Sequence, residues 1–109
     1  MMYKLKNKVM TQKYYEIGDD ESVLEYVIKH KNSLDPADTF IVAGVNGTLY
    51  EFNMIAAITL EELLKRSSHA EVAEALISVF YIDDTRALKT VEFTAKELLS
   101  KGVIEKINL

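Results

Sequence analysis

An Asn-Gly dipeptide at positions 46–47 constrains the fold of this chain more than any other feature. It separates two runs rich in β-branched and aromatic residues within Thr39–Phe52. Asparagine and glycine both accept the positive φ angles of a two-residue type I′ turn, and the twist of that turn matches two antiparallel strands. The sequence therefore predicts a β-hairpin over this segment.

The register of this hairpin divides its side chains between two faces, because successive residues of a strand point to opposite sides. The face that we expect to pack on the core carries Ile41, Ala43, Val45, Thr48, Tyr50 and Phe52. The second face carries Phe40, Val42, Gly44, Leu49, Glu51 and Asn53. Only half of this second face is polar, so it is a candidate for coverage by another element or another subunit.

A first helix is predicted from about Glu21 to Asn32. Gly18-Asp19-Asp20 offers a turn and an N-cap, and the apolar residues that follow are spaced as one face of a helix. A strand is expected before it, over Val9–Ile17, although the alternation there is only approximate.

Three capping boxes predict further helix starts, at Thr59, Ser68 and Thr94. Each is followed three positions later by glutamate, and the boxes at Thr59 and Thr94 also have the apolar pair of a hydrophobic staple. We expect the second of these helices to reach about Ile82 and the third to end at Gly102.

Two segments near the C-terminus are predicted as extended. Ala87–Phe93 has apolar residues at helical spacing, but the staple at Phe93 favours an extended segment before Thr94. Val103–Ile107 is expected to add a short final strand. The predicted class is α+β, a single domain over 1–109 with an antiparallel sheet and its central hairpin packed on three or four short helices. Residues 1–8 are expected to form a basic arm or an edge strand.

The composition excludes several kinds of chemistry. The chain has 109 residues and no cysteine, so disulfides, thiolate catalysis and thiolate-bound metals are excluded. No apolar stretch has the length of a membrane span or the pattern of a signal peptide, and a cytoplasmic protein is expected. No cofactor and no metal are predicted.

The motifs with chemical associations have simpler interpretations. His69-Ala70-Glu71 has the His-x-Glu spacing of zinc deaminases but lacks their paired cysteines, so a capping box is preferred. Asp83-Asp84 is interpreted as a solvated turn, because no second acidic cluster accompanies it. Gly44–Thr48 leads into a strand, whereas a phosphate-binding loop leads into a helix.

A net charge of -4 argues against general affinity for nucleic acid or anionic lipid. The leading hypothesis is a non-enzymatic inhibitor or adaptor that binds another protein with a basic surface, analogous in size and charge to bacteriocin immunity proteins and phage inhibitors of nucleases. The apolar surface of the helix after Ser68 also suggests a homodimer. The predicted contact residues are Glu61, Glu62, Glu71, Glu74, Ile77, Tyr81, Asp83 and Asp84.

Two alternative functions remain open. One is binding of single-stranded nucleic acid or a nucleotide, in which lysines contact phosphates and aromatic rings stack on bases. It would use Lys4, Lys6, Lys8, Lys13, Tyr14 and Tyr15. The other is an enzyme whose active site is assembled from scattered residues, without a recognisable motif.

Overall fold

The predicted hairpin forms the centre of a three-stranded antiparallel sheet. In the computed structural model, which describes residues 2–107, β3 (Ile41–Val45) and β4 (Thr48–Phe52) flank the turn. Asn46 and Gly47 have φ angles of 50° and 84°, as a type I′ turn requires. The third strand, β2 (Met10–Lys13), pairs with β3, so β2 and β4 are the two edges. It is shorter than the strand predicted over Val9–Ile17.

A second sheet joins the two ends of the chain. Strand β1 (Tyr3–Leu5) pairs antiparallel with β5 (Ile104–Lys106). The short final strand was predicted, and Tyr3–Leu5 forms the edge strand that was expected as the alternative to a basic arm. Tyr3 is buried, and its hydroxyl lies 2.7 Å from Nε2 of His69. Burial of this ring anchors the N-terminal segment to the helices.

The first two helices differ from their predicted boundaries. Helix α1 (Val23–His30) lies inside the predicted range, is capped by Ser22, and continues into the 3₁₀ turn η1 (Lys31–Ser33). Helix α2 (Met54–Lys65) begins five residues before Thr59. Its N-cap is Asn53, whereas Thr59 lies buried inside the helix and donates to the carbonyl of Ile55 at 2.7 Å. The predicted start at Thr59 was wrong because the apolar run before it is already helical.

The last two helices form an antiparallel pair. Helix α3 (His69–Ile77) begins at the predicted Ser68 cap but ends before Ile82. Helix α4 (Asp84–Ser100) contains all of the segment 87–93, so the extended segment and the helix start at Thr94 were both wrong. The apolar spacing prevailed over the apparent box, since Ala87, Val91 and Leu98 are buried along one stripe. Gly102 follows α4 with φ 75°, which confirms the predicted helix end.

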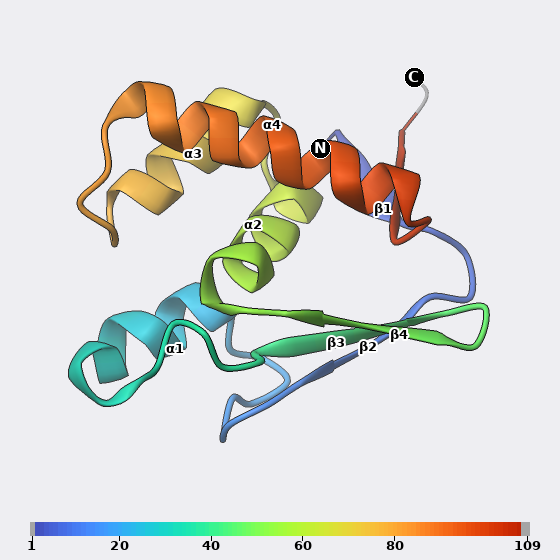
Figure 1. The fold of residues 1–109 in the computed structure, drawn as a ribbon, viewed down its shortest axis with the longest axis horizontal. Coiled ribbons are helices and arrows are strands. Elements are labelled where there is room, and N and C mark those ends of the chain that lie inside the picture. Colours follow the sequence, from blue (N-terminus) through green and yellow to red (C-terminus); the bar gives the residue numbers. More distant parts are fainter. Residues whose placement is uncertain (1, 108–109) are drawn as a thin grey trace.

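The elements form a sheet layer and a helical layer. Helix α2 contacts α1, α3, α4, β1 and β4, and Figure 1 shows it between the sheet and the α3–α4 pair. The predicted core face is buried at Ile41, Ala43, Val45 and Phe52, while Tyr50 is half-buried and Thr48 exposed. The architecture confirms the α+β class. No helix within residues 2–107 is long and apolar enough to cross a bilayer.

Candidate functional site

Strand β4 presents a free edge with two residues whose backbone groups point outward. The amide of Tyr14 donates to the carbonyl of Phe40 at 2.9 Å, which fixes the even-numbered residues of β3 as those bonded to β2. The odd-numbered residues of β3 therefore bond to Thr48, Tyr50 and Phe52 of β4. The remaining two residues of β4, Leu49 and Glu51, direct their N–H and C=O groups away from the sheet.

A groove runs along this free edge, between β4 and α4. Its cavity volume is about 470 Å³. The lining residues come from β4, α4, the start of α2 and the segment before β3; they include Thr39, Tyr50, Glu51, Phe52, Ala56, Phe93, Thr94, Glu97, Leu98 and Lys101. Figure 1 shows α4 crossing the molecule above the hairpin in the direction opposite to β4. An extended chain at the edge of β4 would thus have α4 as its second wall.

The α4 wall carries an apolar group, Phe93, and an ion pair that begins one helical turn later. Phe93 has 67% of its surface exposed although it lies in the middle of a helix. Glu97 follows one turn later and accepts from Lys101 at 3.0 Å. The ammonium of Lys101 also lies 5.6 Å from the centroid of the Tyr50 ring, so one side chain links α4 to β4. The groove thus offers both apolar and charged contacts.

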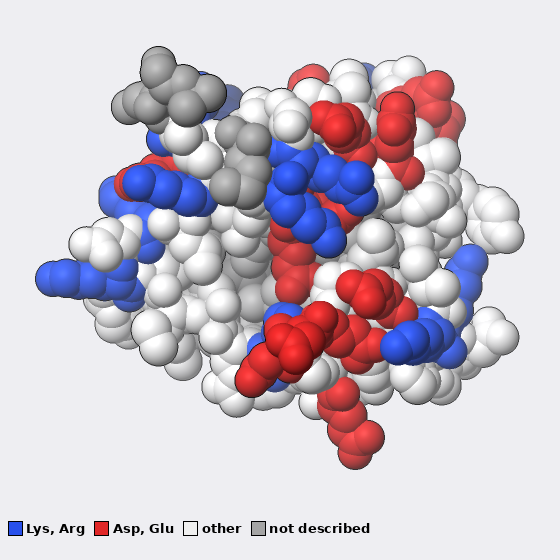
Figure 2. Space-filling view, turned by 180° about the vertical axis from the view of Figure 1, so that it is seen from behind, with Lys and Arg blue, Asp and Glu red and all other residues white. Residues whose placement is uncertain are grey.

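The predicted acidic contact residues do not share one surface. Figure 2 shows acidic side chains in several patches, with basic groups between them. Glu71, Glu74, Asp83 and Asp84 are exposed around α3 and the start of α4, beside Tyr81, which is 99% exposed; Ile77 is half-buried there. Two of these acids take part in helix capping: Glu71 accepts from the hydroxyl of Ser68, the N-cap of α3, and Asp83 is the N-cap of α4 and accepts from the amide of Arg86.

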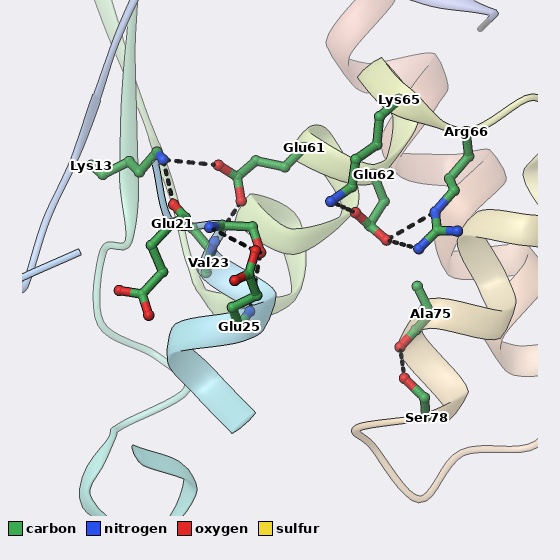
Figure 3. Close-up of polar contacts among 11 residues, drawn as sticks. Lys13, Glu21, Val23, Glu25, Glu61, Glu62, Lys65, Arg66, Ala75 and Ser78 are labelled. Carbon is green, nitrogen blue, oxygen red and sulfur yellow. Dashed lines mark hydrogen bonds and ion pairs between the residues drawn. The ribbon is translucent and has the colours of Figure 1, made fainter. Parts of the chain in front are cut away.

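Glu61 connects α2 to the start of α1 and to β2 (Figure 3). Oε1 of Glu61 accepts from the amide of Val23 at 2.7 Å, and Oε2 lies 3.7 Å from Nζ of Lys13. These contacts fix the start of α1 against α2. Both carboxylate oxygens of Glu61 therefore already have contacts within the fold, which limits its use as a contact for a partner.

Glu62 is buried, so its prediction as a surface contact was wrong. Its side chain is 1% exposed, and Oε1 accepts from Nε and Nη2 of Arg66 at 3.2 and 3.0 Å. Oε2 lies 2.8 Å from Nζ of Lys65, as an ion pair without hydrogen-bond geometry. Lys65 in the last turn of α2 and Arg66 at its C-cap, three and four residues after Glu62, both reach the carboxylate (Figure 3).

The basic residues of the nucleic-acid alternative are dispersed in the structure. Lys4 pairs with Glu105 at 3.3 Å, and Lys13 donates to the carbonyl of Glu21 at 2.6 Å. Tyr15 stacks on Phe40 with ring centroids 4.8 Å apart. Several of these groups thus already have partners within the fold.

The hydroxyl of Tyr15 also donates to Asp38, and this hydrogen bond raises its pKa to about 12. Tyr14 is 42% exposed, while Lys6 and Lys8 lie near the end of α4.

Among residues 2–107, no group of three histidine or carboxylate side chains is placed to hold a metal ion. His69 belongs to the capping region of α3 and stacks on Tyr3 at 5.8 Å, and Glu71 is a cap partner. The motif at 69–71 therefore has a structural explanation.

Sequence reasoning missed the groove. The sequence feature that pointed toward the groove was the second, half-polar face of the hairpin, which contains both Leu49 and Glu51. Phe93 was interpreted as a staple residue because it precedes an apparent capping box. The groove itself joins β4 to residues of α4 that lie more than 40 positions later, beginning with Phe93, and no local pattern reveals this contact.

Comparison with known proteins shows a similarity of fold. No protein-family model matches the chain, and no curated protein matches it by sequence. A solved structure described as a lasso peptide synthetase B1 complexed with the leader peptide superposes with a TM-score of 0.67. The match covers 94% of this chain and 96% of that chain, at 19% sequence identity. At this identity the similarity shows a shared fold.

Proposed function

We propose that this protein binds an extended peptide segment of a partner protein, which pairs with β4 as an added strand. The observation that carries this proposal is the free edge of β4 beside a groove. Leu49 and Glu51 offer two donors and two acceptors at the i, i+2 spacing that a neighbouring strand uses. Backbone bonds of this kind give affinity, while pockets for alternate side chains give specificity.

The fold comparison supports a peptide as the kind of partner. The structure that superposes with this chain is described as complexed with a leader peptide. A small domain that holds a peptide works as an adaptor without chemistry of its own, which agrees with the protein-binding hypothesis from the sequence. The proposed contact surface differs, because the groove replaces the acidic helix as the leading site.

A second candidate site is the surface around Tyr81. This ring is 99% exposed, and Nζ of Lys31 lies 5.0 Å from its centroid. Exposed tyrosines often anchor protein interfaces. Together with Glu71, Glu74, Asp83 and Asp84, it would contact the basic surface of a partner, as an inhibitor does. The two surfaces are separate enough to be tested independently.

The test is selection of ligands from a displayed library of random linear 12-residue peptides. Selected peptides are then measured against Leu49→Pro and Glu51→Pro. Proline removes the outward N–H of each position without removing a β3–β4 bond, and edge strands tolerate it. Thr11→Pro is the matched control, because Thr11 has the corresponding outward position on β2. Circular dichroism checks the fold of each variant.

We expect both β4 variants to weaken binding about tenfold and Thr11→Pro to leave it unchanged. Each β4 variant loses one backbone hydrogen bond to the peptide, and the loss of one such bond costs up to about 1.5 kcal/mol, which is about tenfold in affinity. A second measurement needs no variant: peptide addition should shift the NMR amide signals of Leu49 and Glu51. If the library yields only ligands that leave these signals and both variants unaffected, the proposed function is wrong.

A further inference from the structure

A second cavity adjoins the groove at the free edge of β4. This tyrosine pocket has a volume of about 360 Å³ and is lined by Tyr14, Tyr15, Asp38, Thr39 and Glu51. Thr39 and Glu51 line both the groove and the tyrosine pocket. The two cavities therefore meet at the edge to which a peptide strand would be added.

The tyrosine pocket lies on the face of the sheet that points away from α4. Glu51 belongs to the second face of the hairpin together with Phe40, and the ring of Tyr15 stacks on Phe40. Tyr50 and Phe52 belong to the other face and line the groove together with residues of α4. Figure 1 shows α2 and α4 on one side of this sheet. A strand added to β4 would thus have α4 on one face and the tyrosine pocket on the other.

The tyrosine pocket has an excess of negative charge. Asp38 accepts from the hydroxyl of Tyr15, and Glu51 accepts from the hydroxyl of Thr39 at 3.1 Å. Within residues 2–107, no lysine, arginine or histidine forms an ion pair with either carboxylate. The hydrogen bond to Asp38 is the main cause of the raised pKa of Tyr15, and the charges of Asp38 and Asp35 raise it further. Such a negative potential favours a cationic group on the ligand.

Two tyrosine rings add a surface that suits a cation on a long aliphatic stem. Tyr14 and Tyr15 are 42% and 40% exposed. An ammonium or guanidinium group over the face of an aromatic ring is attracted by the negative charge of that face. The methylene groups of a lysine or arginine side chain also pack well on apolar surface. Carboxylates and rings together therefore match the side chain of Lys or Arg.

The geometry of strand pairing directs one peptide side chain to this pocket. In an antiparallel pair, two residues that exchange both N–H and C=O bonds lie directly opposite each other. Their side chains project from the same face, with Cβ atoms about 5 Å apart. The peptide residue that bonds to Glu51 therefore projects its side chain beside the Glu51 carboxylate, on the face of the tyrosine pocket. Its two neighbours in the peptide project toward α4.

We infer that the peptide bound to β4 carries a Lys or Arg residue opposite Glu51, and that this side chain binds between Glu51 and Asp38 against the tyrosine rings. This inference rests on the proposed function, because it names a side chain of the ligand of the same edge. With antiparallel pairing, the next peptide residue lies opposite Tyr50. Both existing neighbour pairs of this sheet are antiparallel, and such pairing is slightly more stable than parallel pairing.

The sequences of the selected peptides provide the first test. Among ligands that Leu49→Pro weakens, we expect enrichment of Lys or Arg at one aligned position. Leu49→Pro serves here because Glu51→Pro removes a carboxylate as well as an N–H group. Replacing the enriched base by glutamine in a synthetic peptide should weaken binding about fivefold, the typical effect of a partly exposed ion pair together with a cation–π contact.

The second test changes the two carboxylates. Glu51→Gln with Asp38→Asn keeps the backbone groups of β4 and should weaken binding of the basic peptide about fivefold, while its glutamine version binds as before. Asp19→Asn with Asp20→Asn is the matched control, because it removes the same charge from exposed positions that line neither cavity. The affinity for the basic peptide should also fall with added salt more steeply than that for the glutamine version.

The register is tested by NMR of the complex with the basic peptide. In an antiparallel pair, opposed residues that do not bond to each other have their Cα atoms closest together. We therefore expect a nuclear Overhauser effect between Hα of Tyr50 and Hα of the peptide residue directly after the base. The same effect to Hα of the base itself would place its side chain on the α4 face and overturn the inference.

The outcomes separate this inference from the proposed function. Ligands that require Leu49 but show no enrichment of Lys or Arg, or that bind the Glu51→Gln/Asp38→Asn variant normally, would overturn the inference and leave the peptide-binding function intact. Ligands that neither respond to Leu49→Pro nor shift the amide signals of the β4 edge would overturn both. Equal weakening by the control pair would also overturn the inference, since the effect would then come from net charge.

Discussion

The ammonium of Lys101 lies 5.6 Å from the centroid of the Tyr50 ring, and this contact connects the end of α4 to the free-edge strand β4. Cation–π contacts at exposed sites contribute about 0.5–1 kcal/mol. A double-mutant cycle of Lys101→Met and Tyr50→Leu, measured by urea unfolding, should give a coupling free energy in this range. Lys96→Met replaces Lys101→Met in the control cycle, and a coupling of equal size there would contradict the assignment.

The buried carboxylate of Glu62 should make Arg66 important for stability. Arg66→Ala leaves Oε1 without its two hydrogen bonds, and an unsatisfied buried acceptor costs about 1–3 kcal/mol. Lys29→Ala, which breaks the exposed pair with Glu21, should cost less than about 1 kcal/mol. Both free energies come from urea unfolding.

A second variant tests whether the loss of stability in Arg66→Ala comes from the buried carboxylate of Glu62 that has lost its hydrogen bonds. Glu62→Leu combined with Arg66→Ala should be more stable than Arg66→Ala alone, because an apolar group replaces the buried carboxylate. If the double variant is less stable, the carboxylate contributes through Lys65 and the explanation fails.

The pair of Glu21 and Lys29 predicts a dependence on acid. The hydrogen bond from Lys29 holds the pKa of Glu21 below its ordinary value of 4.5. The stabilisation from this depressed pKa is present above the unfolded value and is lost as the pH falls through the folded value. In Lys29→Gln, the pKa of Glu21 measured by carboxyl NMR titration should rise toward 4.5. Lys31→Gln removes an equal charge nearby and should leave it unchanged.

The parts of the fold that could be predicted depend on neighbouring residues. The Asn46-Gly47 turn, the Ser68 cap and the end of α4 at Gly102 are each specified by a few adjacent positions whose backbone angles or side-chain bonds are local. Capping boxes are less specific than turns, because Thr59 and Thr94 fit the pattern inside longer helices. There the apolar stripe, which tertiary packing buries, determines the helix start.

The candidate site could not be predicted because it depends on contacts between distant segments. The pairing of β1 with β5 joins residues about 100 positions apart, and the groove joins β4 to the second half of α4. Tertiary packing also buries Glu62, a residue of α2. An acidic residue and a basic residue one turn apart look solvent-exposed in sequence, and only the packing of α2 shows that this carboxylate is buried.

Two exposed aromatic side chains, Phe93 in the groove and Tyr81 beside the acidic residues, distinguish the two candidate surfaces. Phe93 and Tyr81 are 67% and 99% exposed, so replacing either by serine should change the unfolding free energy by less than about 0.5 kcal/mol. If peptides bind beside α4, Phe93→Ser should weaken binding about tenfold or more, because aromatic anchors dominate such contacts. Tyr81→Ser should have no effect on the same peptides in fluorescence anisotropy. The opposite result, with Tyr81 required and Phe93 dispensable, would favour the acidic surface around α3 as the binding site.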